Sequence, residues 1–186
     1  MTVGIAPRKL TYEDYLGFPE DGKRHELIDG DHVAEPSPNT IHQRISANLH
    51  RLLGNHVHQH RLGWLLAAPC DVVLSDVDVV EPDLLFLAVS HAERLTRANV
   101  QGPPDLVVEI GSESTRRRDE TTKRHLYERY GVPEYWVVDP ELETLKIWRL
   151  IDARYERIAD LSAEAGDRLA TPLFAGLEIG LAEIFE

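Results

Sequence analysis

The chain of 186 residues suits one domain over residues 1–186, and its content of 42% hydrophobic and 28% charged residues is ordinary for a globular protein. A net charge of −12, from 20 lysines and arginines against 32 aspartates and glutamates, argues against tight metal-free binding of nucleic acid. One cysteine excludes an internal disulfide, and no apolar run nears the roughly 20 residues of a membrane helix, so we expect a soluble, cytoplasmic protein with no membrane contact.

The first third of the chain predicts a short helix, a hairpin and a long helix. Thr11 and Asp14 have the spacing of a capping box at the start of the short helix. The dipeptide Asp29-Gly30, within HELIDGDHV, is typical of a tight hairpin turn. After the loop PSPNT, residues 41–61 repeat apolar side chains at helical spacing and predict one long amphipathic helix.

The rest of the chain predicts more strands than helices. A polar connection is expected over residues 90–104, a helix rich in basic residues over residues 115–130, and a loose tail over residues 177–185. The strands are predicted over residues 64–74, 79–89, 105–110, 134–139, 144–150 and 153–161. We therefore predict an α+β domain with a curved mixed β-sheet flanked by two main helices.

Two carboxylates on separate predicted strands are candidates for a metal site. Asp83 opens the apolar segment DLLFLAV, and Glu109 interrupts the apolar run of DLVVEI, where a carboxylate is costly unless it is paired or bound to a metal. Asp105 shares a strand face with Glu109 but lies roughly 13 Å along it. Asp83, on a neighbouring strand, can approach Glu109 to about 5 Å. The ordinary alternatives are a turn aspartate at Asp83 and an arginine salt bridge at Glu109.

Lys123 is the third candidate, because helical spacing puts Asp119, Lys123 and Tyr127 in one stripe at the edge of the face that packs against the sheet. The ammonium can reach the two carboxylates, supported by Asp119 or Tyr127, or it can extend to solvent. Glu26, on the apolar face of its strand, is either a further metal ligand or a hairpin salt-bridge partner. His42, at the start of the long helix, is either a supporting residue of the site or a capping residue.

The predicted basic helix concentrates positive charge that the chain as a whole lacks. A patch of this kind can bind the phosphates of a nucleic acid, although it does not distinguish DNA from RNA. The residues expected at this contact are Arg116, Arg117, Arg118 and Arg124.

Taken together, these motifs resemble the Uma-two family of restriction-endonuclease-like proteins in the PD-(D/E)XK nuclease superfamily. The resemblance is carried by Pro82-Asp83, by DLVVEI ending in Glu109, by the Lys123–Tyr127 helix and by GVPEYWVVDP, and it extends to HELIDG, PSPNTIH and GLEIGLAEIF. It implies a restriction-endonuclease-like core, with helices on both sides of a central mixed sheet and magnesium at the two acids. The usual superfamily lysine lies two residues after the glutamate, where this chain has Gly111, so the resemblance is to members in which the next helix supplies the lysine.

The leading hypothesis is an endonuclease that depends on Mg²⁺ or Mn²⁺ and hydrolyses phosphodiester bonds of nucleic acid, with DNA as the expected partner. Asp83, Glu109 and the backbone carbonyl of Ile110 would hold the ion, with Glu26 as a possible further ligand, and Lys123 would orient water or neutralise charge on the phosphate. Two alternatives stay open. The acidic balance and the displaced lysine favour a catalytically inactive nuclease-fold binding module, and the lack of an extended basic arm favours a metal-dependent hydrolase of a small phosphoester. Exposed strand edges also favour a homodimer.

Overall fold

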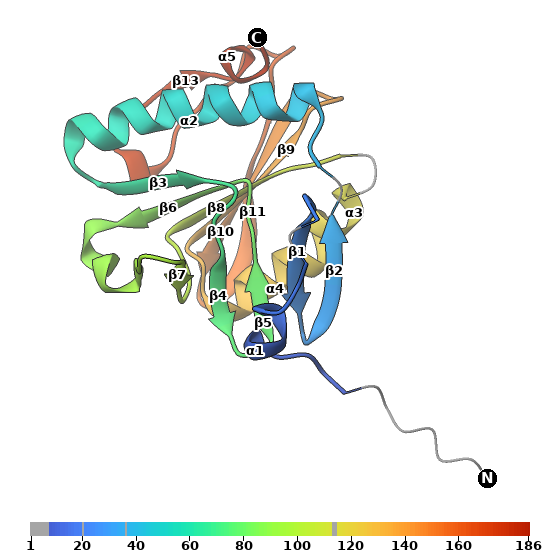
Figure 1. The fold of residues 1–186 in the computed structure, drawn as a ribbon. Coiled ribbons are helices and arrows are strands. Elements are labelled where there is room, and N and C mark those ends of the chain that lie inside the picture. The colour runs from blue at the N-terminus through green and yellow to red at the C-terminus, as the bar shows by residue number, and fades with distance from the viewer. Residues whose placement is uncertain (1–7, 20, 36, 113–114) are drawn as a thin grey trace.

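The computed structural model describes residues 8–19, 21–35, 37–112 and 115–186, and its centre is a six-stranded mixed sheet (Figure 1). The strand order is β11-β10-β9-β8-β6-β3, and within it only β8 and β9 run parallel. The strands are β3 (Gly63–Ala67), β6 (Leu84–Ala88), β8 (Leu106–Ile110), β9 (Glu134–Asp139), β10 (Thr144–Ile151) and β11 (Arg154–Ser162). The α+β class with a curved mixed sheet is confirmed.

A second, five-stranded sheet packs against one face of the first. Its order is β2-β1-β5-β4-β7, and all pairs are antiparallel except β4 with β7. The strands are β1 (Arg24–Ile28), β2 (Asp31–Glu35), β4 (Val72–Ser75), β5 (Asp78–Val80) and β7 (Val100–Gln101). A two-stranded ribbon, β12 (Arg168–Leu169) with β13 (Ile179–Gly180), lies in the C-terminal segment.

Helices cover both faces of the six-stranded sheet. In Figure 1, α2 lies across one face with α5 beyond it, and α4 lies on the opposite side. The helices are α1 (Tyr12–Tyr15), α2 (Thr40–His60), α3 (Arg116–Arg118), α4 (Arg124–Tyr130) and α5 (Ala182–Phe185), with 3₁₀ helices η1 (Val89–Arg94) and η3 (Pro172–Phe174) and a π-helical turn η2 (Asp119–Lys123). Within the described ranges, none of these helices is long and apolar enough to span a membrane.

The predicted capping and turn residues of the first elements are confirmed. Thr11 and Asp14 form the reciprocal capping box of α1, and Asp29 and Gly30, both with positive φ, make the turn between β1 and β2. In α2 the side chain of Asn39 accepts the backbone N–H of residue 42 at 2.9 Å, which satisfies a donor that the helix leaves free. The apolar face of α2 that packs on the sheet consists of Ile45, Leu49, Leu53 and Val57.

Alternation along the strands decides which side chains face the functional region. Leu84 and Phe86 of β6 point toward α2, whereas Leu85 and Leu87 point toward α4 and the smaller sheet. The same period of two puts Val107 on the α4 side of β8, and therefore Glu109 as well.

The two long strands predicted over residues 64–74 and 79–89 are each divided between the two sheets. The first becomes β3 and β4, with Pro69 in the break, and the second becomes β5 and β6, with Pro82 in the break. Proline cannot donate to the hydrogen-bond ladder, so each segment leaves one sheet and enters the other there. The predicted loose tail is also wrong, because β13 and α5 are ordered and contribute Ile179 and Ile184 to the core.

Candidate active site

The structure brings Asp83 and Glu109 together at the ends of two adjacent strands. In the antiparallel pair β6–β8, Leu84 lies opposite Val108, so the next residues along the pair, Asp83 and Glu109, lie opposite each other on the α4 side. Each is only 3% exposed. Asp105, at the other end of β8, instead accepts a hydrogen bond from the backbone N–H of residue 88 at 2.7 Å.

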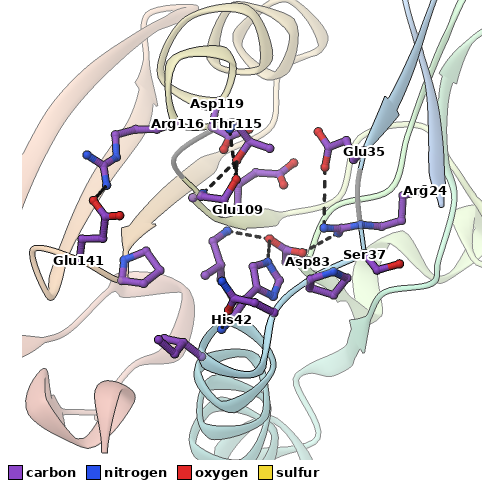
Figure 2. Close-up of a pocket in the computed structure, with 17 residues that line it drawn as sticks. Arg24, Glu35, Ser37, His42, Asp83, Glu109, Thr115, Arg116, Asp119 and Glu141 are labelled. Carbon is purple, nitrogen blue, oxygen red and sulfur yellow. Dashed lines mark hydrogen bonds and ion pairs between the residues drawn. The ribbon is translucent and has the colours of Figure 1, made fainter. Parts of the chain in front are cut away.

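Both carboxylates line a pocket of about 800 Å³, which Figure 2 shows in close-up. The N-terminal end of α2, the hairpin β1–β2, the end of β8 and the start of the α3–η2–α4 segment enclose it. The lining residues are Arg24, Glu35, Ser37, Pro38, Asn39, Ile41, His42, Asp83, Glu109, Ile110, Gly111, Ser112, Thr115, Arg116, Asp119, Pro140 and Glu141. Ile41, which the helical pattern assigns to the apolar face of α2, is 50% exposed at this pocket.

Asp83 is held by three nitrogen atoms from three elements. Its Oδ2 accepts the backbone N–H of Ile110 at 2.7 Å and lies 3.0 Å from Nε2 of His42. Its Oδ1 accepts a hydrogen bond from Nη1 of Arg24 at 2.6 Å. Burial alone would raise the pKa of Asp83, but the contacts with His42 and Arg24 outweigh burial and lower it, so the carboxylate is charged at neutral pH.

Glu109 is anchored through one oxygen by the following helical segment. Its Oε1 accepts hydrogen bonds from Nζ of Lys123 at 3.1 Å and from the hydroxyl of Tyr127 at 2.8 Å. In the described part of the chain, Oε2 receives no hydrogen bond. Burial raises the pKa of Glu109 well above its ordinary value, and the charge of Lys123 opposes that shift.

Lys123 is completely buried in a nest of carboxylates. Besides Glu109, its Nζ lies 3.0 Å from Oε1 of Glu26 and 3.5 Å from Oε1 of Glu35. Burial would lower the pKa of Lys123, but these acids raise it well above its ordinary value, so the ammonium stays charged. Lys123 does not line the pocket and contacts Glu109 from the protein interior, so its predicted role toward a water or a phosphate stays a prediction.

The other predicted side chains fall into two groups. Tyr127 and Glu26 belong to the nest around Lys123, and Glu26 does not line the pocket. His42 and Asp119 line the pocket, and Asp119 has one buried oxygen, Oδ1, without a hydrogen-bond partner in the described structure. Burial raises the pKa of Asp119 to about 6.

Most of the arginines predicted to contact nucleic acid have partners within the protein. Arg116 pairs with Asp139 at 3.0 Å and with Glu141 at 2.8 Å. Arg118 pairs with Glu35, and the guanidinium of Arg124 lies over the Trp148 ring. Arg117 is exposed. A role for these arginines in binding nucleic acid stays a prediction.

Sequence reasoning missed two residues of the site, Arg24 and Glu35. They face each other at the open end of the β1–β2 hairpin, with Nη2 of Arg24 3.7 Å from Oε2 of Glu35. The predicted turn at Asp29-Gly30 contains the signal, because counting outward from it pairs residue 24 with residue 35.

The donor set fits a hard divalent cation better than a soft one. Among the described residues, no group of three or more His, Cys, Asp or Glu side chains is arranged to hold a metal ion. Two carboxylates and the carbonyl of Ile110 are nevertheless a sufficient set of oxygen ligands for Mg²⁺, which keeps several of its waters.

The buried charges at the site also favour a cation. The carboxylates at the site outnumber the cations, so full ionisation leaves an excess of negative charge that a divalent ion would reduce. The carboxylates are those of Glu26, Glu35, Glu81, Asp83, Glu109 and Asp119, and the cations are Arg24, Arg118 and Lys123.

A mixed sheet with helices on both faces, with carboxylates paired at the ends of two adjacent strands and a buried lysine beside them, is typical of the restriction-endonuclease-like class of folds. The family described as "Putative restriction endonuclease" (Uma2) matches residues 12–182, and the chain belongs to that family. This confirms the resemblance and identifies the protein as a member of a nuclease family.

A solved structure agrees with that assignment at the level of the fold. The crystal structure of a "putative nuclease belonging to DUF820" from Anabaena variabilis ATCC 29413 superposes with a TM-score of 0.79 at 19% identity, covering 95% of this chain and 97% of that chain. No curated protein matches the sequence.

Proposed function

We propose that the protein is an endonuclease that hydrolyses phosphodiester bonds of nucleic acid, with DNA as the expected substrate and Mg²⁺ or Mn²⁺ as the cofactor. The observation that carries the proposal is the pairing of Asp83 and Glu109 across two strand ends at the wall of a pocket, with Lys123 3.1 Å from Glu109. Membership of a nuclease family supports the same reaction.

Asp83, Glu109 and the carbonyl of Ile110 would hold the ion. When bound, such an ion supplies positive charge to the phosphoryl group and makes water more acidic. Lys123 then acts as a positioning residue, because its ammonium and the Tyr127 hydroxyl fix one oxygen of Glu109.

Asp119 also lines the pocket. With a pKa of about 6 it is ionised at neutral pH, and its charge adds to the negative charge that would attract a cation.

The test is nicking of supercoiled plasmid in Mg²⁺ or Mn²⁺, with and without EDTA. The parent is expected to nick only with the divalent ion. Asp83→Asn and Glu109→Gln keep the side-chain shapes but remove charge, and each should lose more than the roughly 100-fold that weaker outer contacts of a metal site cost. Equal rates in the parent and both variants would show that these residues are not the catalytic ligands.

Asp105→Asn is the matched control. Asp105 is also a buried carboxylate at an end of β8, but it lies apart from the pocket and accepts a backbone N–H that asparagine can still satisfy. It should keep parental activity, so a loss confined to the Asp83 and Glu109 variants is specific to the site. Single-stranded RNA and a small phosphodiester, tested in parallel, determine the substrate class.

A second candidate is a nuclease-fold binding module without catalysis. It is favoured by the guanidinium of Arg24, which contacts the Asp83 oxygen that a metal ion would need. Calorimetry separates the two, because a pure binding module should bind no divalent ion at millimolar concentrations.

A further inference from the structure

Arg24 occupies the side of Asp83 that a cation would approach. Its side chain is 16% exposed, and its Nη1 lies 2.6 Å from Oδ1, the only Asp83 oxygen that neither Ile110 nor His42 contacts in the described structure. A carboxylate offers about four lone-pair positions, and three nitrogen atoms already occupy Asp83. A divalent ion at Oδ1 would therefore lie beside a guanidinium that cannot lose its proton.

Arg24 has a second set of partners within a short movement. Its Nη2 is 3.7 Å from Oε2 of Glu35, and its Nε is 3.9 Å from Oε1 of Glu81. Both distances exceed hydrogen-bond length by less than about 1 Å. Nε of Arg24 and Oε1 of Glu81 are also buried without a hydrogen-bond partner among the described residues. Unsatisfied buried groups of opposite charge are costly, and a small rotation of Arg24 would satisfy both.

We propose that, in the metal-free protein, Arg24 occupies the position beside Asp83 that a divalent cation would take. When the metal binds, Arg24 turns to Glu81 and Glu35. The inference rests on the proposed function, because it takes Asp83 to be a metal ligand. Arg24 balances the charge of Asp83 when metal is absent, and Glu81 and Glu35 balance the charge of Arg24 when metal is present.

The proposal predicts shifts of opposite sign in two variants. Arg24→Gln removes the competing cation, so Mn²⁺ should bind about tenfold or more tightly, because no charge-assisted hydrogen bond must be broken first. Glu81→Gln removes the second partner of Arg24, so Mn²⁺ should bind several-fold more weakly.

The experiment is calorimetric titration of the full chain with Mn²⁺ at pH 8, without nucleic acid. Arg118→Gln is the control for Arg24→Gln, because it removes the same charge beside Glu35 without contacting Asp83. Glu141→Gln is the control for Glu81→Gln, because it removes a pocket acid that Arg24 does not contact. Both controls should shift the affinity by less than the variants they match.

Each outcome bears on the proposal. If Arg24→Gln and Arg118→Gln tighten Mn²⁺ binding equally, or if Arg24→Gln does not tighten it, Arg24 does not compete with the metal and the proposal is overturned. The proposed function still stands if the parent binds Mn²⁺ and Asp83→Asn does not. Absence of Mn²⁺ binding in the parent and every variant overturns both. If circular dichroism shows that Arg24→Gln is unfolded, Glu81→Gln decides, and an affinity equal to that of Glu141→Gln overturns the proposal.

Discussion

Lys123 is a shared counterion for three buried carboxylates. Its ammonium lies within 3.5 Å of carboxylate oxygens from Glu26, Glu35 and Glu109, and none of its surface is exposed. Removing one partner of a buried ion pair is much more damaging than removing both, because the remaining charge has neither water nor a counterion. Lys123 is therefore as important to stability as to the arrangement of Glu109.

Lys123→Met should destabilise the metal-free protein by about 3–5 kcal/mol at pH 8. The loss of unfolding free energy relative to the parent should be smaller at pH 5. Burial raises the pKa of Glu109 and of Glu26, so in the folded variant these acids take up protons at a higher pH than in the unfolded chain, and stability falls as pH rises above their ordinary pKa of 4.5. Urea unfolding at both pH values, with a chelator, measures the difference. A deficit of the same size at pH 5 and pH 8 would contradict the account.

Lys146→Met is the control for that change. Lys146 pairs with Glu120 at the surface and its side chain is 26% exposed, so its loss should cost less than about 1 kcal/mol at either pH.

The sequence predicted the site residues whose positions follow from strand pairing. Asp83 and Glu109 follow from two apolar strands, each with a carboxylate at one end. The turn at Asp29-Gly30 pairs Arg24 with Glu35, but no local pattern brings Arg24 to Asp83, because that contact depends on the smaller sheet folding over the larger one. The burial of Lys123 was underestimated because its partners Glu26 and Glu35 come from the same smaller sheet.

Among the elements, α2 has two functions, since it covers one face of the sheet and brings its N-terminal end to the pocket. Asn39 caps that end and His42, in the first turn, contacts Asp83. A helix that frays at this end would move His42 away from the carboxylate, so the cap supports both the stability of the helix and the geometry of the site.

Asn39→Ala should lower the free energy of unfolding by about 1 kcal/mol, the usual cost of losing a side-chain N-cap. Asn55→Ala is a matched control with the opposite expected sign, because Asn55 is exposed in the interior of α2, where alanine has the higher helix propensity. Thermal unfolding of both variants tests the assignment. Equal melting temperatures for the two would argue against a capping role.

Element types were more predictable than element boundaries. The basic helix was expected as one continuous helix, and the structure inserts the π-helical turn η2 at Asp119–Lys123, so that both ends of the turn face inward. Helical spacing alone places Lys123 only at the edge of the buried face. The divided strands have a related cause, because composition does not tell whether a strand stays in one sheet across a proline.

At the scale of the whole molecule, the C-terminal segment completes the core. Phe174 is fully buried, and its ring centroid lies 4.9 Å from that of Phe86 and 6.4 Å from that of Trp136 on the α2 side of the sheet. The side chain of Asn48 on α2 donates to the carbonyl of Ile184, which fixes α5 against that helix. The sequence suggested a loose tail because its elements are too short to show periodicity.

Phe174→Ala should therefore cost about 3–5 kcal/mol of stability, as large-to-small changes in a packed core do. Leu142→Ala, at a side chain that is 65% exposed in a turn, should change stability by less than about 0.5 kcal/mol. Denaturant unfolding distinguishes the two. A loss at Phe174 as small as that at Leu142 would show that the segment is peripheral.

The meeting of three elements on Asp83 has a consequence for incompletely folded copies of the chain. His42, Arg24 and the N–H of Ile110 come from regions far apart in the sequence, and each reaches the carboxylate only after its own element has docked. A nascent or proteolytically nicked copy that lacks any one of these dockings has no complete centre. On the proposed function, newly made chains would cleave no phosphodiester bond until all three contacts have formed, so nuclease activity would report complete folding.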